Sequence, residues 1–290
     1  MTGVLDRLGP LATTGVGSLP FTEPGEAVGH VVREYALPFC PQLPRLEGDM
    51  VREWLGGDPG RCGWSPERDR ERPAAWEAFT HAMRVQPPEH GVVKLQVTGP
   101  ATLAAALEGR GRYDLASEIA RWLAANAAGQ VRRLGELGLA AVLVVDEPGL
   151  ADAGIADPRA YDPLRSTGAS AWGLHVCGRV PWGLVDWLEV DLLSFDVVRH
   201  DADGPVLSRI IDRGGRIAWG LLDAVASEEP PRVAARLRTA LGTVGREPEL
   251  VASRSLLTPT CGTGLLSSAQ EARAADVLGA TASSMRQQLF

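Results

Sequence analysis

Short apolar runs alternate along the chain with longer segments in which apolar residues recur every three or four positions. Short runs that end at glycine, proline or polar residues are typical of buried strands, and the longer spacing is typical of amphipathic helices. The sequence therefore predicts eight strands, at residues 11–17, 37–43, 92–97, 140–145, 171–175, 191–195, 216–219 and 249–253.

The helical pattern is clearest over residues 114–137, where the apolar positions fall close to one face of a helix. Pro230 and Pro231 predict the start of another helix, because proline is favoured in the first turn. The last predicted helix runs from about residue 267 to residue 278. Strands and helices thus alternate along the whole chain.

This alternation predicts an α/β protein whose parallel strands are joined by right-handed crossovers. Eight such units within 290 residues fit a single (β/α)8 TIM barrel over residues 1–290 better than an open, doubly wound sheet. The open sheet is expected to carry a glycine-rich phosphate loop, and the chain has neither G-x-G-x-x-G nor a Walker sequence. Residues from about 56 to 73 are polar and rich in glycine and proline, and we interpret them as an excursion from the barrel.

Charge and composition argue against nucleic acid and membranes as partners of the protein. The net charge is −7, and the chain has no run of basic residues that would bind nucleic acid or a membrane surface. Lys94 is its only lysine beside 28 arginines, which we attribute to genomic base composition. No signal-peptide pattern is evident, and no apolar run approaches the roughly 18 residues of a membrane span. Four irregularly spaced cysteines are too few for a disulfide scaffold, so we expect a cytoplasmic protein with reduced thiols.

The residues with the most distinctive chemistry follow the predicted strands. In a TIM barrel the carboxyl ends of the strands converge on one mouth, where the active site is built. We therefore expect the side chains that follow the first, fourth, fifth, sixth, seventh and eighth strands to meet there: Ser18, Asp146, His175 with Cys177, Asp196, Asp223 and Cys261.

Four of these residues suggest a metal site. His175 and Cys177 lie two apart at a strand end, and Cys261 lies in a turn that opens onto the same rim. Asp196 ends an otherwise apolar strand, where a carboxylate needs a partner. A histidine or cysteine often sits in a core without binding anything, but together these residues match the nitrogen and thiolate ligands of zinc. We therefore predict a zinc ion bound by His175, Cys177, Asp196 and Cys261.

Ligands from three separate strands indicate a catalytic rather than a structural zinc. Two thiolates and a carboxylate more than neutralise Zn²⁺, so the metal would activate water poorly. It would instead lower the pKa of a bound thiol and keep the thiolate reactive. The expected step is attack of that thiolate on an alkyl group. Cys40 and Cys62 have no partner at ligand spacing, and we expect buried or incidental thiols there.

The other residues at the mouth suit an amino-acid substrate. Asp146 is predicted to bind an ammonium group, and the turn at Gly17 and Ser18 offers N–H groups and a hydroxyl to a carboxylate. The alternatives are structural. Asp146, Glu147 and Pro148 also match a helix N-terminal cap, and Gly17 and Ser18 also match a simple turn.

Seven motifs together resemble the catalytic domain of cobalamin-independent methionine synthase. They are scattered over most of the chain: TTGVGSLP, GDMV, VTGPATL, VVDEPGL, LHVCG, VDLLSFD and TPTCG. The resemblance implies a barrel of the uroporphyrinogen decarboxylase and methionine synthase type. It implies that the zinc ligands are His175, Cys177 and Cys261, and that Asp196 stands where the family has a glutamate ligand. It further implies contacts to the homocysteine carboxylate and amine from Ser18 and Asp146.

The chain also departs from this family. It lacks the N-terminal half of the long enzymes, and the family glutamate that contacts the amine falls at Pro44. After the seventh strand the family has a G-x-x-D-x-H turn whose histidine transfers a proton to the folate leaving group. Here Asp223 is kept, with a possible supporting role, but Val225 replaces the histidine. Because a methylcorrinoid leaves without needing that proton, the replacement favours a corrinoid donor.

The sequence therefore predicts a zinc-dependent methyltransferase that makes methionine from homocysteine, with methylcobalamin or a corrinoid protein as the donor. A second hypothesis is a zinc enzyme acting on another thiol, such as coenzyme M. Arg179 and Arg199 near the mouth would suit its sulfonate, whereas Asp146 argues for an amino acid. A third hypothesis is a non-catalytic module that binds zinc or a corrinoid protein.

Overall fold

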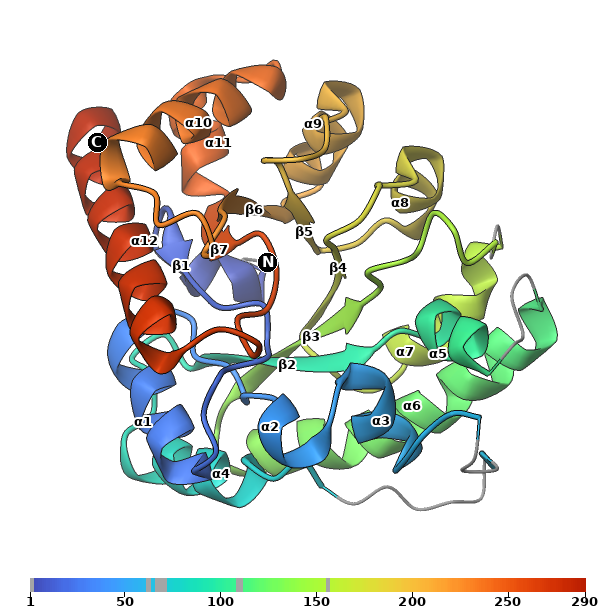
Figure 1. Ribbon diagram of the computed structural model, residues 1–290. Helices are drawn as coiled ribbons and strands as arrows, with labels where there is room; N and C mark the ends of the chain where they lie inside the picture. Colours follow the sequence, from blue (N-terminus) through green and yellow to red (C-terminus); the bar gives the residue numbers. More distant parts are fainter. Residues whose placement is uncertain (1–2, 61–63, 66–71, 108–111, 155–156) are drawn as a thin grey trace.

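The computed structural model describes residues 3–60, 64–65, 72–107, 112–154 and 157–290. Its centre is a curled sheet of seven parallel strands in the order β1-β7-β6-β5-β4-β3-β2, with helices packed around the outside (Figure 1). The strands are β1 (Ala12–Thr13), β2 (Val92–Thr98), β3 (Ala140–Asp146), β4 (Ala171–Val176), β5 (Leu192–Asp196), β6 (Arg216–Leu222) and β7 (Ser255–Pro259).

The second predicted strand, residues 37–43, is not a regular strand. It makes only isolated bridges, Phe39 with Lys94 of β2 and Ser18 with Gln42. Pro38 and Pro41 interrupt the segment, and proline cannot donate a ladder hydrogen bond. The segment still hydrogen-bonds to the chain on both sides, through Leu37 N to Thr13 O at 2.9 Å and Lys94 N to Pro38 O at 2.9 Å. The structure thus shows a seven-stranded curled sheet and does not confirm a regular eight-stranded barrel.

The prediction of a strand at residues 249–253 was wrong. These residues form most of helix α11 (Pro248–Ser253), and the strand is β7, which follows it. Pro248 occupies the first turn of the helix, where its fixed φ and missing N–H are tolerated. The true strand contains Leu256 and Leu257, which are both fully buried because both faces of the sheet are covered.

The helices connect successive strands. The predicted helices at 114–137 and after Pro230 are confirmed as α6 and α10, and the last helix extends eleven residues past its predicted end, from 278 to 289. The others are shorter. In the described part of the chain no helix has the length and apolar character that crossing a membrane requires. The α-helices are α1 (Pro24–Glu34), α2 (Pro44–Glu47), α3 (Met50–Leu55), α4 (Trp76–Val85), α5 (Pro100–Ala106), α6 (Tyr113–Glu136), α7 (Asp162–Arg165), α8 (Trp182–Leu188), α9 (Gly204–Asp212), α10 (Pro230–Thr243), α11 and α12 (Ser268–Leu289).

The excursion predicted from about 56 to 73 lies partly outside the described residues, as does Cys62. Its first residue, Gly56, ends α3 in the left-handed conformation with φ 69°. Helix α12 packs on β7 and β1, which lie at the opposite end of the strand order from β2 (Figure 1).

The inner face of the curled sheet changes from apolar to polar along the strands. Val142 and Val144 of β3 belong to a small apolar cluster with Leu192 of β5, and the 3-10 helix Val4–Arg7 adds Leu5 to it. Because side chains alternate along a strand, the next inward position of β3 is Asp146 at its carboxyl end. The polar groups of the inner face therefore collect at the mouth of the sheet.

Lys94 is a charged residue that lies inside the curled sheet and not at its mouth. Its side chain is only 3% exposed, and its ammonium donates to the carbonyl of Val16 and, at 3.3 Å, to Oε1 of Gln96. Burial lowers its pKa to about 8, although the nearby charge of Asp146 acts in the opposite direction. The chain's only lysine thus supports the loop that leads to Ser18.

Candidate metal and substrate site

His175, Cys177 and Cys261 come together at the mouth of the sheet. His175 lies near the end of β4, Cys177 follows that strand directly, and Cys261 lies just beyond β7. Strands β4 and β7 are separated by two others in the sheet, so its curvature is what brings the two cysteines together. Their sulfur atoms are 3.7 Å apart.

The imidazole of His175 is oriented by β5. Its Nδ1 is 2.9 Å from Oγ of Ser194, and its Nε2 is buried without a hydrogen-bond partner among the described residues. The hydroxyl of Ser194 can accept a hydrogen bond from Nδ1–H, and in that tautomer Nε2 has a lone pair for a ligand. His175 lines the same cavity as the two cysteines, and its imidazole interacts with the Cys261 thiol, so Nε2 is the ring atom available to bind a metal.

These donors fit a zinc ion. Two thiolates on one tetrahedral zinc, each at about 2.3 Å, have sulfur atoms about 3.8 Å apart, close to the separation of Cys177 and Cys261. Among the described residues, no group of three or more His, Cys, Asp and Glu side chains is arranged to hold a metal ion as the structure stands. The fit therefore rests on the two sulfurs and on the unpartnered Nε2 of His175.

The two thiols differ in acidity. The contact with Cys177, and after it that with His175, holds the pKa of the Cys261 thiol well below its usual range. The same sulfur contact, together with burial and the charge of Asp146, raises the pKa of Cys177. The two thiols therefore titrate as a coupled pair, with the negative charge favoured on Cys261.

Asp146 lies beside His175 in the register of β3 and β4. It is 3% exposed, and its Oδ1 has no hydrogen-bond partner among the described residues. Burial raises its pKa to about 6, and the charges of His175 and Lys94 only partly oppose that shift. A buried, unpartnered carboxylate oxygen favours a cationic ligand, because such a ligand would replace the lost hydration.

The predicted alternative of a helix N-terminal cap applies to Glu147 and not to Asp146. The carboxylate of Glu147 accepts hydrogen bonds from the N–H groups of Ala101 and Thr102, both at 2.8 Å, at the start of α5. It also accepts from the hydroxyl groups of Thr102 and Tyr161. Glu147 is therefore structural, and Asp146 remains available to the cavity.

Ser18 is held under the loop that carries Cys261. Its carbonyl accepts from Thr263 N–H at 3.0 Å, and its Oγ accepts from Gly264 N–H at 3.4 Å. Gly262 packs so closely that a Cβ there would lie 2.1 Å from Oγ of Ser18. This close approach joins the predicted carboxylate-binding turn to the predicted metal ligand.

Gly262→Ala is expected to destabilise the protein by about 1–3 kcal/mol, because the new methyl group must displace the Ser18 hydroxyl. Urea denaturation measures this loss. Gly279→Ala is the matched control, since a Cβ at that helical position meets no atom within 4 Å. The control should be unchanged or up to about 1 kcal/mol more stable. A Gly262→Ala protein as stable as the wild type would contradict the close contact.

A cavity of about 220 Å³ opens over these residues. Its described lining includes no lysine or arginine but contains three carboxylates, so its charge suits an ammonium group better than a sulfonate. Sequence reasoning missed two polar lining residues, Gln42 and Glu53, which are joined by a 2.8 Å hydrogen bond. The lining residues are Val16, Ser18, Gln42, Pro44, Gly48, Asp49, Met50, Glu53, Asp146, Pro148, His175, Cys177, Cys261, Gly262 and Leu265.

Asp196 is not brought together with the other predicted ligands. It lies at the end of β5 and is 1% exposed, but its oxygens are bound by the turn that follows. Oδ1 accepts from Val198 N–H at 2.7 Å and from Arg199 N–H at 3.1 Å, and Oδ2 accepts from the Arg199 guanidinium at 2.8 Å. The partner that this buried carboxylate needs is thus Arg199.

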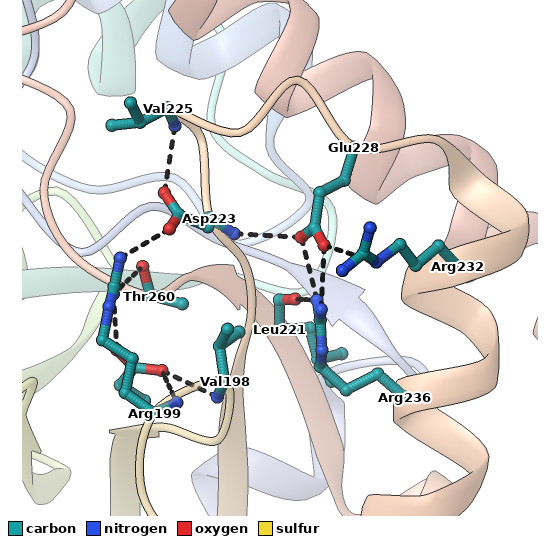
Figure 2. A network of polar contacts seen from close by, with 10 residues as sticks. Val198, Arg199, Leu221, Asp223, Val225, Glu228, Arg232, Arg236 and Thr260 are labelled. Carbon is teal, nitrogen blue, oxygen red and sulfur yellow. Dashed lines mark hydrogen bonds and ion pairs between the residues drawn. The ribbon is translucent and has the colours of Figure 1, made fainter.

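Arg199 connects this turn with Asp223, which follows β6. Figure 2 shows its guanidinium between Asp223, at 2.5 Å, and Thr260, at 3.5 Å. Val225 points away from this network and is 68% exposed, and only its N–H takes part, by donating to Asp223 (Figure 2). Asp223 therefore supports the rim of the site and has no described contact with the cysteines.

The fold has known relatives among solved structures. One is a B12-independent methionine synthase from Shewanella sp. W3-18-1 in complex with selenomethionine, with a TM-score of 0.58 and 19% identity over 76% of this chain and 69% of that chain. Another is a methyltransferase from Methanosarcina mazei, with a TM-score of 0.63 and 14% identity over 98% of this chain and 97% of that one. At these identities the similarity is one of fold. No protein-family model matches the sequence, and no curated protein matches it.

Proposed function

We propose that this protein is a zinc-dependent methyltransferase that transfers a methyl group to the thiol of homocysteine and forms methionine. The observation that carries the proposal is the 3.7 Å pair of Cys177 and Cys261 beside the unpartnered Nε2 of His175. Asp146 lies in the same cavity with an unpartnered oxygen of its own. Thiolate ligands and an ammonium-binding carboxylate in one cavity suit a substrate that carries both a thiol and an amine.

His175, Cys177 and Cys261 would hold the metal, and Ser194 orients the imidazole through its contact with Nδ1. Zinc, when bound, would lower the pKa of the substrate thiol. Asp146 would bind the substrate ammonium, and the turn at Ser18 would bind its carboxylate. These two contacts orient the substrate sulfur toward the donor.

In the proposed transfer the substrate sulfur attacks the methyl carbon. A sulfur–carbon bond forms, the bond between the methyl group and the donor breaks, and its electron pair leaves with the donor. A methyltetrahydrofolate donor would need a proton at its nitrogen. Val225 cannot supply that proton, and the adjacent Asp223 is paired with Arg199. The turn after β6 therefore favours a methylcorrinoid donor.

The charged groups around the cavity argue against a sulfonate thiol. Arg199 is paired with Asp196 and Asp223, and the exposed Arg179 lies 3.5 Å from Asp152. Neither arginine lines the cavity, whereas Asp146 does. A negatively charged sulfonate would therefore meet like charge there.

An assay of each donor with each acceptor tests the proposal. Zinc-replete protein is incubated with methylcobalamin or methyltetrahydrofolate, and with homocysteine or coenzyme M. Methionine is expected from methylcobalamin and homocysteine. Asp146→Asn should keep its zinc but raise the KM for homocysteine at least about tenfold, since an ion pair is lost.

Other outcomes would overturn particular parts of the proposal. Use of methyltetrahydrofolate but not of methylcobalamin would overturn the donor, and faster methylation of coenzyme M would overturn the acceptor. Tight zinc binding without turnover on either thiol would support a non-catalytic binding module instead.

A further inference from the structure

Asp196 is held at three points by its own turn. Two backbone N–H groups bind one carboxylate oxygen, and the guanidinium of Arg199 binds the other. Asp196 does not line the cavity that contains His175, Cys177 and Cys261. To reach a metal there, its side chain would have to leave this turn and break the contacts that hold it. Because the carboxylate is 1% exposed, water could not replace these partners.

Arg199 is itself fixed from two further strand ends. It binds Asp223 after β6 and contacts Thr260, the residue before Cys261 (Figure 2). Asp223 is held in turn, because its N–H donates to Glu228 at 3.3 Å and Glu228 pairs with Arg236 at 2.8 Å. The network therefore holds Asp196 in its turn through residues that do not themselves line the cavity.

We infer that the metal centre of this protein has three protein ligands, His175, Cys177 and Cys261, and that the Arg199 network keeps Asp196 from becoming a fourth. The inference rests on the proposed zinc site and makes it more specific. Three protein ligands with an open position are typical of catalytic zinc. Two thiolates already balance the charge of Zn²⁺, so a third anion is not needed until the substrate arrives.

The open position has a consequence for the substrate. Its thiolate would bind the metal without displacing a protein carboxylate, and Asp196 would act as a positioning residue for the Arg199 turn. Substrate binding then would not depend on movement of the β5 turn.

Zinc affinity distinguishes the two coordination schemes. The full chain is freed of metal, and Zn²⁺ is titrated in competition with a chromophoric chelator. Asp196→Asn, which keeps the size of the side chain, is expected to bind zinc within about threefold of the wild type. Cys261→Ser, the matched ligand variant, should bind at least about 100-fold more weakly. An equal loss in both variants would overturn the inference.

A second measurement does not depend on the folding of a variant. In a crystal structure of the zinc-loaded wild type, Asp196 should remain bound to Val198 and Arg199. An Asp196 oxygen within roughly 2.2 Å of the zinc would overturn the inference. In Co²⁺-loaded protein, homocysteine should increase the thiolate-to-metal absorption equally in wild type and Asp196→Asn.

These readouts separate the inference from the proposed function. A three-ligand zinc centre in a protein that methylates no thiol would overturn the function and leave the inference standing. A wild-type chain that binds no zinc would overturn both.

Discussion

Cys261→Ser is expected to lose at least about 100-fold in both zinc affinity and methyl transfer. The serine hydroxyl stays protonated near neutral pH, so it cannot replace a thiolate that also neutralises the metal. Its oxygen would also no longer make the 3.7 Å sulfur contact with Cys177. Zinc content after dialysis and the rate of methionine formation measure the two losses.

Cys40→Ala is the control for this variant. Cys40 is buried in the segment between β1 and β2 and does not line the cavity. Its substitution should leave zinc content and the rate of methyl transfer unchanged. Full zinc content and full activity in Cys261→Ser would contradict the assignment of the metal site.

Glu147→Ala is expected to lower the free energy of unfolding by about 3–5 kcal/mol, the largest effect on stability that we predict. Its side chain is fully buried and is the acceptor for two N–H groups at the start of α5 and for the hydroxyls of Thr102 and Tyr161. Alanine would leave the buried donors of Ala101 and Tyr161, and the half-buried donors of Thr102, without this acceptor. Urea denaturation measures the loss, and Glu136→Ala on the exposed surface of α6 is the control.

The same residue predicts a dependence on pH. Burial raises the pKa of Glu147 above its ordinary 4.5, although its hydrogen bonds partly oppose the shift. Between 4.5 and the raised value the folded protein holds a proton that the unfolded chain has released. The contribution of Glu147 to stability is therefore full below pH 4.5 and decreases as the pH rises through the raised value.

Glu147→Gln removes this titration. The variant should therefore be destabilised more, relative to the wild type, near pH 4.5 than at pH 8. Urea denaturation at several pH values measures this difference. A difference that is constant with pH, or that grows as the pH rises, would contradict the raised pKa.

Much of the fold could be predicted from the periodicity of apolar residues, and the predictions that were wrong have local causes. The long amphipathic pattern of α6 and the paired prolines of α10 predicted those helices correctly. Residues 37–43 have the apolar character of a strand, but Pro38 and Pro41 remove the donors that a regular ladder needs. Residues 249–253 have too short a pattern to separate a strand from one helical turn and a half.

The candidate site was predicted less evenly. The sequence placed His175, Cys177 and Cys261 at strand ends, and the curvature of the sheet brings them together. It could not show where Asp196 points, because a metal and an arginine three residues later both satisfy a buried carboxylate. It favoured Asp146 for the ammonium group but left a helix cap open as the alternative, and the structure assigns that cap to Glu147.

Because Lys94 is buried, its rate of chemical modification can measure how often the interior of the sheet becomes exposed to solvent. An amine-directed reagent finds no other lysine, and the ammonium of Lys94 lies inside the sheet under the loop to Ser18. In the folded protein it should therefore be acylated only as fast as the interior becomes exposed. Mass spectrometry of the peptide that carries it would follow that opening at a single residue, without an introduced label.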